Sequence, residues 1–162
     1  MKSHQKKLNI FWVLIIMILA SCDGDGGSSV TGPGTLSSDV AGIWEFSGQM
    51  SANTCTFLEV EIGSPSNDWI TVAQEGSTLT GVDSSGNMTL RGRVSGNSFS
   101  LTQTNPSTST VDSCTFSAGS EIAVRRTNET SGRGTWNIVW TGNCPLLQLP
   151  CTVVSTGSWI RR

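Results

Sequence analysis

The sequence predicts an all-β domain in which about eight antiparallel strands follow one another as an up-and-down meander and close into a barrel. Short runs alternate apolar and polar residues with a period of two, and clusters of Gly, Ser and Asn separate these runs. No stretch of the globular part has the periodicity of an amphipathic helix. Closure into a barrel removes the exposed edges of such a sheet, and a two-sheet sandwich is the alternative.

The clearest pattern is a hairpin between Met88 and Thr102. Met88 and Leu90 fall on one face of its first strand, and Phe99 and Leu101 fall on one face of its second. A Ser-Gly-Asn turn separates the two runs, as is typical of a β-hairpin.

The same pattern recurs on both sides of this hairpin. Trp44 and Phe46 share one face of an early strand, and Trp136, Ile138 and Trp140 share one face of a late strand. The segment 105–111, which holds a proline and a Ser/Thr run, is expected to be a loop. Further strands are expected at 40–47, 54–63, 69–74, 78–82, 114–126, 135–141 and 151–162.

The N-terminus has the layout of an export signal. Three lysines in the first ten residues precede an apolar run at 8–20, which is too short to span a bilayer as a permanent helix. The sequence Leu19-Ala20-Ser21-Cys22 then resembles the lipobox of bacterial lipoproteins. An ordinary secretory signal with a chance cysteine, or an uncleaved anchor, is the alternative.

The lipobox resemblance implies a signal peptide at 1–21 and acylation of Cys22 by chains such as palmitate. The protein is then anchored in the bacterial cell envelope, with the outer membrane or cell surface favoured over the inner membrane. Residues 22–38 are rich in Gly, Ser and Asp and are expected to form a flexible tether. The barrel domain is expected at 39–162.

Gly42-Ile43-Trp44 resembles the Gly-x-Trp signature of lipocalins and related calycin barrels. In that family an arginine of the last strand packs across this tryptophan and closes the barrel floor. The resemblance therefore implies a cation–π contact between Trp44 and Arg161 or Arg162. Other lipocalin motifs contain a tyrosine, and this chain has none.

Four cysteines remain besides Cys22, namely Cys55, Cys114, Cys144 and Cys151. An even number in an exported chain predicts disulfides. Of the three pairings, the short proline-bounded loop favours Cys144 with Cys151, which leaves Cys55 for Cys114. A four-cysteine zinc site is the alternative, although no Cys-x₂-Cys pair occurs.

Catalytic chemistry is scarce in the mature chain. The only histidine, His4, and all the lysines lie in the predicted signal peptide, and the chain has no tyrosine. Serine triads, histidine metal sites and Schiff-base lysines are thereby excluded. Glu59 and Glu61 are two residues apart and are interpreted as solvated surface. We therefore expect no enzyme, no cofactor and no metal.

Charge argues against nucleic acid as a partner. After removal of the signal peptide, seven arginines stand against twelve acidic residues, which gives a net charge of −5. Such a chain lacks the cations that neutralise phosphates, and anionic lipid headgroups would repel it.

Two functions remain open. The first is a barrel that binds a small apolar ligand, although the same side chains equally fit a packed interior. The second is an interaction or inhibitor module for a protein partner, in which the loop between Cys144 and Cys151 presents Leu146, Leu147 and Leu149; this loop equally fits a plug over the barrel. The predicted ligand-lining residues are Trp69, Met88, Leu90, Phe99, Leu101, Trp136 and Trp140.

Overall fold

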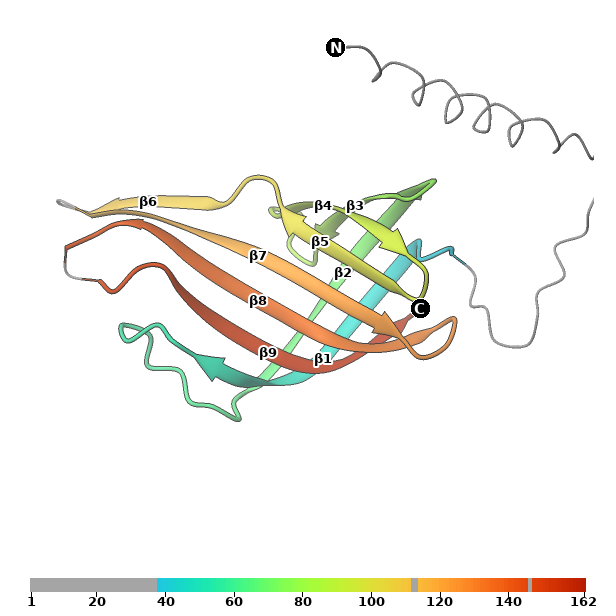
Figure 1. Cartoon of the computed structure of the whole chain (residues 1–162), viewed down its shortest axis with the longest axis horizontal. Helices are drawn as coiled ribbons and strands as arrows, with labels where there is room; N and C mark the ends of the chain where they lie inside the picture. The colour runs from blue at the N-terminus through green and yellow to red at the C-terminus, as the bar shows by residue number, and fades with distance from the viewer. Residues whose placement is uncertain (1–37, 112–113, 146) are drawn as a thin grey trace, which may run out of the picture. The chain divides into compact units, whose positions relative to one another are not determined.

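The computed structural model describes residues 38–111, 114–145 and 147–162, which form one antiparallel sheet (Figure 1). No helix with the length and apolarity of a membrane span occurs in these residues. The strands are β1 (Gly42–Asn53), β2 (Pro65–Glu75), β3 (Thr78–Asp83), β4 (Thr89–Ser95), β5 (Ser98–Gln103), β6 (Ser107–Val111), β7 (Cys114–Arg126), β8 (Ser131–Asn143) and β9 (Cys151–Arg161).

Eight of these strands close into a barrel. Strands β1 to β5 form a meander, β5 pairs with β7, and β7, β8 and β9 lead back to β1. Strand β6 is additional and pairs with β7. The predicted all-β, lipocalin-like barrel is confirmed, and so are the faces assigned to the Trp44, Met88 and Phe99 strands, which alternate between buried and exposed positions.

Two predicted segments differ from the structure. Residues 54–63 form turns instead of a strand, because the Asn53 side chain organises them locally: its amide nitrogen donates to the carbonyls of Leu58 and Val60, and its oxygen accepts from the Cys55 N–H. Conversely, the Ser/Thr run predicted as a loop forms β6, because the first half of β7 extends past β5 and offers it a free edge.

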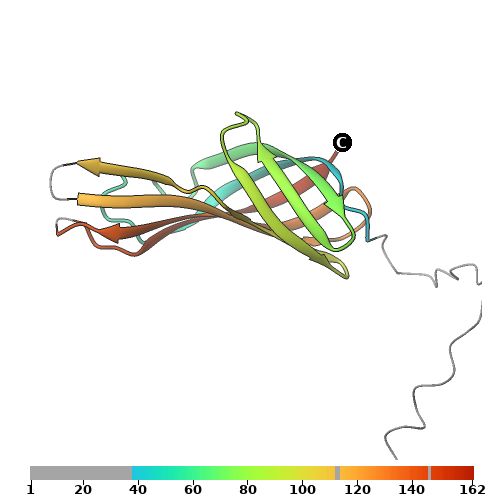
Figure 2. The same ribbon diagram turned by 90° about the horizontal axis from the view of Figure 1, so that it is seen from above.

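The barrel wall is long on one side and short on the other. Strands β7 and β8 have 13 residues each and β1 has 12, whereas β3 and β5 have six. The long strands therefore run past the ends of the short ones, as Figure 2 shows from above. We call the inner face of this extension the apron, and it consists of Phe116, Ala118, Ile138, Trp140 and Val153.

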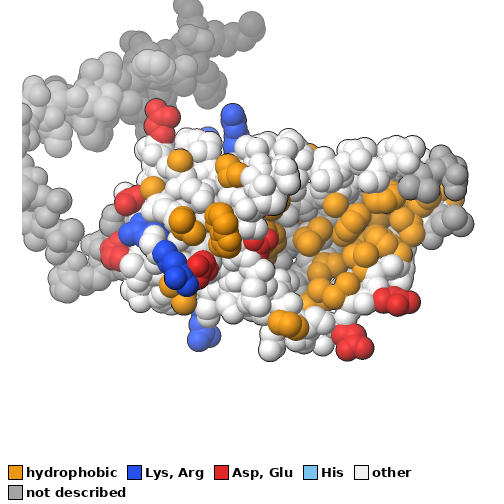
Figure 3. Space-filling model, turned by 180° about the vertical axis from the view of Figure 1, so that it is seen from behind, with side chains coloured by type: hydrophobic (Ala, Val, Ile, Leu, Met, Phe, Trp, Pro, Cys, Tyr) orange, Lys and Arg blue, Asp and Glu red, His pale blue; other side chains and the backbone are white. Residues whose placement is uncertain are grey.

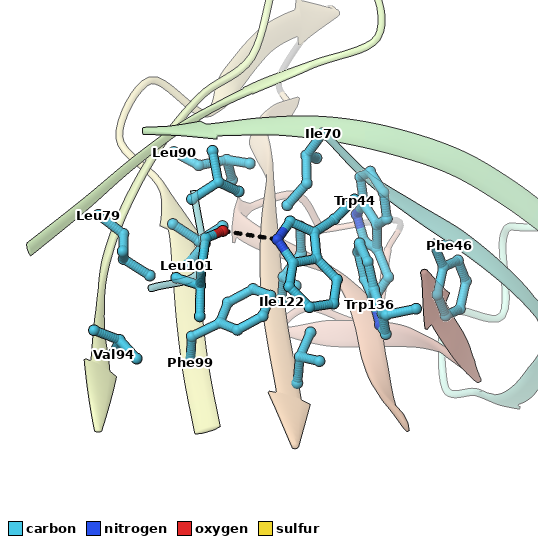
Figure 4. Packing of buried hydrophobic residues seen from close by; sticks show 14 residues of the cluster. Trp44, Phe46, Ile70, Leu79, Leu90, Val94, Phe99, Leu101, Ile122 and Trp136 are labelled. Atoms are coloured by element: carbon cyan, nitrogen blue, oxygen red, sulfur yellow. Dashed lines mark hydrogen bonds between the residues drawn. The ribbon is translucent and has the colours of Figure 1, made fainter. Parts of the chain in front are cut away.

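The barrel interior is packed with apolar side chains below the apron. Trp136 stacks on Trp159, with ring centroids 5.7 Å apart and an interplanar angle of 15°. Phe46 packs against both indoles, at 6.1 Å from Trp136 and 4.9 Å from Trp159. Figure 4 shows residues of this core pointing inward from both walls.

Three inward-facing glycines leave room for the Phe46 ring and for the close approach of neighbouring backbones. Gly48, Gly157 and Gly134 lie directly opposite one another across β1, β9 and β8. A Cβ on Gly48 would lie 2.6 Å from Phe46 Cζ, and a Cβ on Gly134 would collide with the carbonyl oxygen of Ala123. The strands bend inward at this row because no side chain stands between them.

All four cysteines of the domain form disulfides, as predicted, but they pair differently from the prediction. The bonds join Cys55 to Cys151 and Cys114 to Cys144. The prediction was wrong because it paired the cysteines that are nearest in sequence. Cys144 and Cys151 flank the turn between β8 and β9, and each bonds instead to a segment that lies beside its own strand end.

Residues Leu36–Arg162 form a compact unit separate from Met1–Thr35. This unit contains every strand, both disulfides and the whole core of the described residues. We therefore expect it to fold without the first 35 residues, and the experiments use this part of the chain.

The glycine row predicts a position-dependent cost for a single methyl group. Gly134→Ala should destabilise the domain by about 1–3 kcal/mol, because the new Cβ collides with backbone and not with a movable side chain. Gly119→Ala is the matched control, since its Cβ would lie 3.5 Å from Pro106 Cβ, an ordinary contact. Thermal unfolding compares the two, and equal melting temperatures would contradict this account of the row.

The disulfides predict unequal losses on removal. The Cys55–Cys151 bond spans 96 residues and the Cys114–Cys144 bond spans 30. The longer loop restrains the unfolded chain more, so Cys55→Ser/Cys151→Ser should cost about 1 kcal/mol more than Cys114→Ser/Cys144→Ser. Urea unfolding measures the difference, and peptide mapping without reduction checks the pairing; recovery of a Cys144–Cys151 peptide would overturn it.

Candidate functional site

One end of the barrel is closed by the segment that precedes β1. The side chains of Arg126 and Arg161 both donate to the carbonyl oxygen of Asp39, at 3.2 and 3.0 Å. The Trp44 indole N–H donates to the carbonyl of Val40 at 2.8 Å, which Figure 4 marks with a dashed line. We call this closed end the floor.

The predicted floor pair, Trp44 and Arg161, lies at this end. The two residues are directly opposite in the β1–β9 register, and Trp44 is fully buried. Arg161 also donates to the Ala41 carbonyl and lies 3.6 Å from the Asp39 carboxylate. The cation–π contact itself stays a prediction.

Sequence reasoning missed Arg126, which is the buried arginine of the floor. It follows Ile122 and Val124 on the inner face of β7, and its side chain also donates to the Gly96 carbonyl of the β4–β5 turn. The signal was available, because a period of two counted from Ile122 places Arg126 inside the barrel.

The other end of the barrel is open and holds two adjoining cavities of about 230 and 260 Å³. Met88, Ser120 and Ile138 line both of them. We call this region the mouth. Its remaining lining is mostly polar and comprises Ser66, Asn67, Asp68, Asp83, Asn87, Gln103, Ser107 and Ser155. The other lining residues are Trp136, Ala118, Gly119 and Val153.

The predicted ligand-lining residues separate into three groups. Leu90, Phe99 and Leu101 are buried in the packed core, so they fill the interior. Met88 and Trp136 reach the mouth cavities.

The third group comprises the two tryptophans that lie outside the barrel core. Trp140 lies on the apron. Trp69 was wrongly assigned to the interior: it is 40% exposed on the outer wall, because the β2 register turns Ile70 and Val72 inward. It lines a cavity of about 450 Å³ on the outside of β9, β1 and β2, together with Glu45 and Ile160.

The apron continues the inner face of the barrel as an apolar surface. Trp140 contacts Phe57 edge-on, with centroids 5.6 Å apart, and Phe116 at 5.8 Å. Ile138 is 39% exposed between this aromatic cluster and the mouth. Figure 3 shows hydrophobic side chains gathered over the extended end of the molecule, beyond the short wall.

The 144–151 loop does not project its described leucines into solvent as a separate apolar surface. Leu149 packs against the buried pair Cys55 and Cys151 and the neighbouring Val153. Leu147 is half-buried, and Leu146 lies outside the described residues. The loop thus forms part of the rim of the apron.

Asp83 is a charged group on the rim of the mouth. Its carboxylate accepts hydrogen bonds from Ser85 Oγ at 2.5 Å and from the Met88 N–H at 2.8 Å. Slight burial acts to raise the pKa of Asp83, but these bonds, with those from the N–H groups of Ser85 and Asn87, outweigh it and lower the pKa. The carboxylate therefore stays ionised and holds the β3–β4 turn.

No group of three or more His, Cys, Asp or Glu side chains placed to hold a metal ion occurs among the described residues. Glu59 and Glu61 are both exposed, as the interpretation of solvated surface predicts.

Comparison with known proteins adds one structural similarity. No model of a protein family matches the chain, and no curated protein matches its sequence. Among solved structures, the chain is similar to the monomer form of the M. tuberculosis PknI sensor domain, at 12% identity and a TM-score of 0.44. The match covers 82% of this chain and 90% of that chain. At this TM-score the similarity carries no argument about the site.

The lowered pKa of Asp83 predicts a defined acid dependence. Its stabilising contribution is fully present above the pKa of an unfolded aspartate, about 3.9, and is lost as the pH falls through the lower folded value. Urea unfolding of wild type and Asp83→Asn at a series of pH values should show a stability difference that shrinks in acid. A difference that stays constant down to about pH 2 would contradict the assignment.

Proposed function

We propose that the protein is a lipid-anchored protein of the bacterial cell envelope that binds a small ligand with an apolar body and a polar end. The ligand lies on the apron with its apolar body and places its polar end in the mouth of the barrel. The observation that carries the proposal is the continuity between the apron and the two mouth cavities. The first cavity shares Ile138 and Val153 with the apron, and the second shares Ala118 and Ile138 with it.

The chemistry of the lining supports an amphiphilic ligand. Binding sites for small molecules are concave and mostly apolar, with a few convergent polar groups that fix orientation. Trp140 and Phe116 supply flat apolar area, whereas Ser120 and Gln103 supply hydroxyl and amide groups at the mouth. Gln103 Oε1 already accepts from the Ser120 N–H at 3.0 Å, which fixes that side chain in place.

The packed core limits where a ligand binds. The aromatic stack of Phe46, Trp136 and Trp159 fills the barrel directly below the mouth. A ligand enclosed in the barrel, as first considered, would have to displace these rings. On the apron and in the mouth, a ligand contacts apolar surface without displacing these rings.

Support for the envelope location comes from two sources. The Leu19-Ala20-Ser21-Cys22 motif, the signal peptide and the tether lie outside the described residues, and they stay predictions from sequence. Two disulfides are typical of proteins that fold outside the cytoplasm. Metabolic labelling with palmitate, lost in Cys22→Ser, tests the anchor.

We propose a non-catalytic role, since the mature chain has neither histidine nor lysine for acid–base or nucleophilic chemistry. The alternative role, recognition of a protein partner through the 144–151 loop, gains no support, because Leu149 packs into the apron rim.

Titration of residues 36–162 with lauric acid tests the ligand proposal. Saturable quenching or a blue shift of tryptophan fluorescence is expected. Ile138→Ser should weaken binding roughly tenfold, because it removes apolar area between the apron and the mouth. Ile160→Ser is the matched control: Ile160 is 53% exposed on the outer wall, and its loss should leave the affinity unchanged.

Two results would overturn the ligand proposal. One is a flat fluorescence response in protein that unfolds cooperatively. The other is an equal loss of affinity in both serine variants, since that would place the ligand elsewhere on the surface.

A further inference from the structure

Three exposed arginines gather on the outer wall of the barrel. They are Arg93 on β4, Arg125 on β7 and Arg133 on β8. Figure 1 shows β7 and β8 side by side, and in their register Arg125 lies directly opposite Arg133. Within the described residues, none of the three forms an ion pair with a carboxylate, whereas Arg126, Arg161 and Arg162 each do.

The three arginines surround a groove. A cavity of about 420 Å³ lies between them, and its bottom is formed by small residues that include Ser100, Ala123 and Gly134. A second cavity of about 390 Å³ shares Arg133 and Gly134 and continues to Gly157 on β9. Gly134 and Gly157, at which the strands bend inward, thus also line this groove on the outer face of the wall.

The charges are unfavourable as they stand. Like charges directly opposite each other in an antiparallel pair repel, and no described carboxylate neutralises Arg125 or Arg133. The mature chain is acidic overall, yet three of its seven arginines line one groove. An arrangement of this kind gains free energy when an anion binds, and a guanidinium suits phosphate because it donates two parallel hydrogen bonds.

The groove lies near the floor. Arg125 precedes Arg126, whose backbone N–H donates to the Asn97 carbonyl at 2.7 Å and whose side chain reaches Asp39. Asp39 is the residue at which the predicted tether enters the barrel domain. A chain anchored through Cys22 would therefore enter the domain at the same end as this groove.

We propose that Arg93, Arg125 and Arg133 dock the barrel on the phosphate groups of an anionic membrane. The proposal takes its location from the proposed lipid anchor, but the docking wall binds headgroups by itself. Each arginine near a negatively charged surface strengthens membrane binding about fivefold, so that the three together give roughly a hundredfold effect. Net charge alone predicted repulsion, and the local arrangement reverses that expectation on this wall.

Vesicle sedimentation tests the proposal with residues 36–162, which lack the anchor. Binding is expected to vesicles of phosphatidylcholine with about one third phosphatidylglycerol, to weaken with added salt, and to be absent with phosphatidylcholine alone. Arg133→Gln should weaken it about fivefold, and the triple variant Arg93→Gln/Arg125→Gln/Arg133→Gln should abolish it. All three side chains are exposed and Arg125 repels Arg133, so the variants should melt at the same temperature as the wild type or slightly above it.

Arg162→Gln is the matched control. It removes one positive charge from another wall, where Arg162 pairs with Glu45 at 2.7 Å. If Arg162→Gln and Arg133→Gln weaken vesicle binding equally, net charge and not this wall is responsible, and the proposal fails. It also fails if the domain does not distinguish the two vesicle types.

A third measurement separates a membrane from a soluble anion. Calorimetric titration with inorganic pyrophosphate, together with absent vesicle binding, would make the groove a soluble-anion site and overturn the membrane assignment. Failure of the ligand proposal is distinguishable, because lauric acid binding is measured at the opposite end of the barrel. Failure of the anchor is distinguishable too, because palmitate labelling reports it and the vesicle assay uses a chain without Cys22.

Discussion

The stacked indoles of Trp136 and Trp159 are the contact on which the rest of the structure depends. They lie on the inner faces of the neighbouring strands β8 and β9, and Phe46 packs against both from β1 on the other side of β9. The same three strands carry a row of glycines, at which Gly48 leaves room for the Phe46 ring and the other two let neighbouring backbones approach closely. The packing of the aromatic side chains inside the barrel and the curvature of β1, β8 and β9 therefore depend on each other.

This constraint divides the barrel into two ends with different chemistry. Below the stack, apolar side chains fill the interior, and Arg126 and Arg161 seal the floor through the backbone of Asp39. Above it, the short wall stops while β7, β8 and β9 continue, so their inner face stays apolar without an opposite wall to cover it. The same strands therefore supply a packed core at one end and an apolar surface, the proposed binding site, at the other.

Local patterns in the sequence predicted the barrel and most strand faces, because burial on one side of a strand imposes alternation directly. These patterns gave wrong predictions where contacts between residues far apart in the sequence determine the structure. The turn segment 54–63 alternates as a strand would, yet the bond from Cys55 to Cys151 and the side chain of Asn53 hold it in turns. Trp69 was misplaced because Ile70 and Val72 occupy the inner face of β2, and successive residues of a strand face opposite sides.

The candidate sites depend on differences in strand length and on contacts between side chains of strands that are far apart in the sequence. Neither can be predicted from local sequence patterns. The apron exists because β7 outruns β5, but the length of a strand is set by whether a partner is present. The arginine groove assembles residues of β4, β7 and β8, which are far apart in the chain. Net charge is a sum over the whole chain, so the value of −5 gave no indication that three arginines lie together on one wall.

The two proposals together imply an orientation. Asp39 and the arginine groove share the floor end, whereas the mouth and apron lie at the other. A barrel held by a tether at Asp39 and by Arg125 and Arg133 on headgroups therefore directs its mouth away from the membrane. The apron then faces the aqueous phase, so an amphiphilic ligand reaches it from solution, and the packed core prevents passage through the barrel to the bilayer.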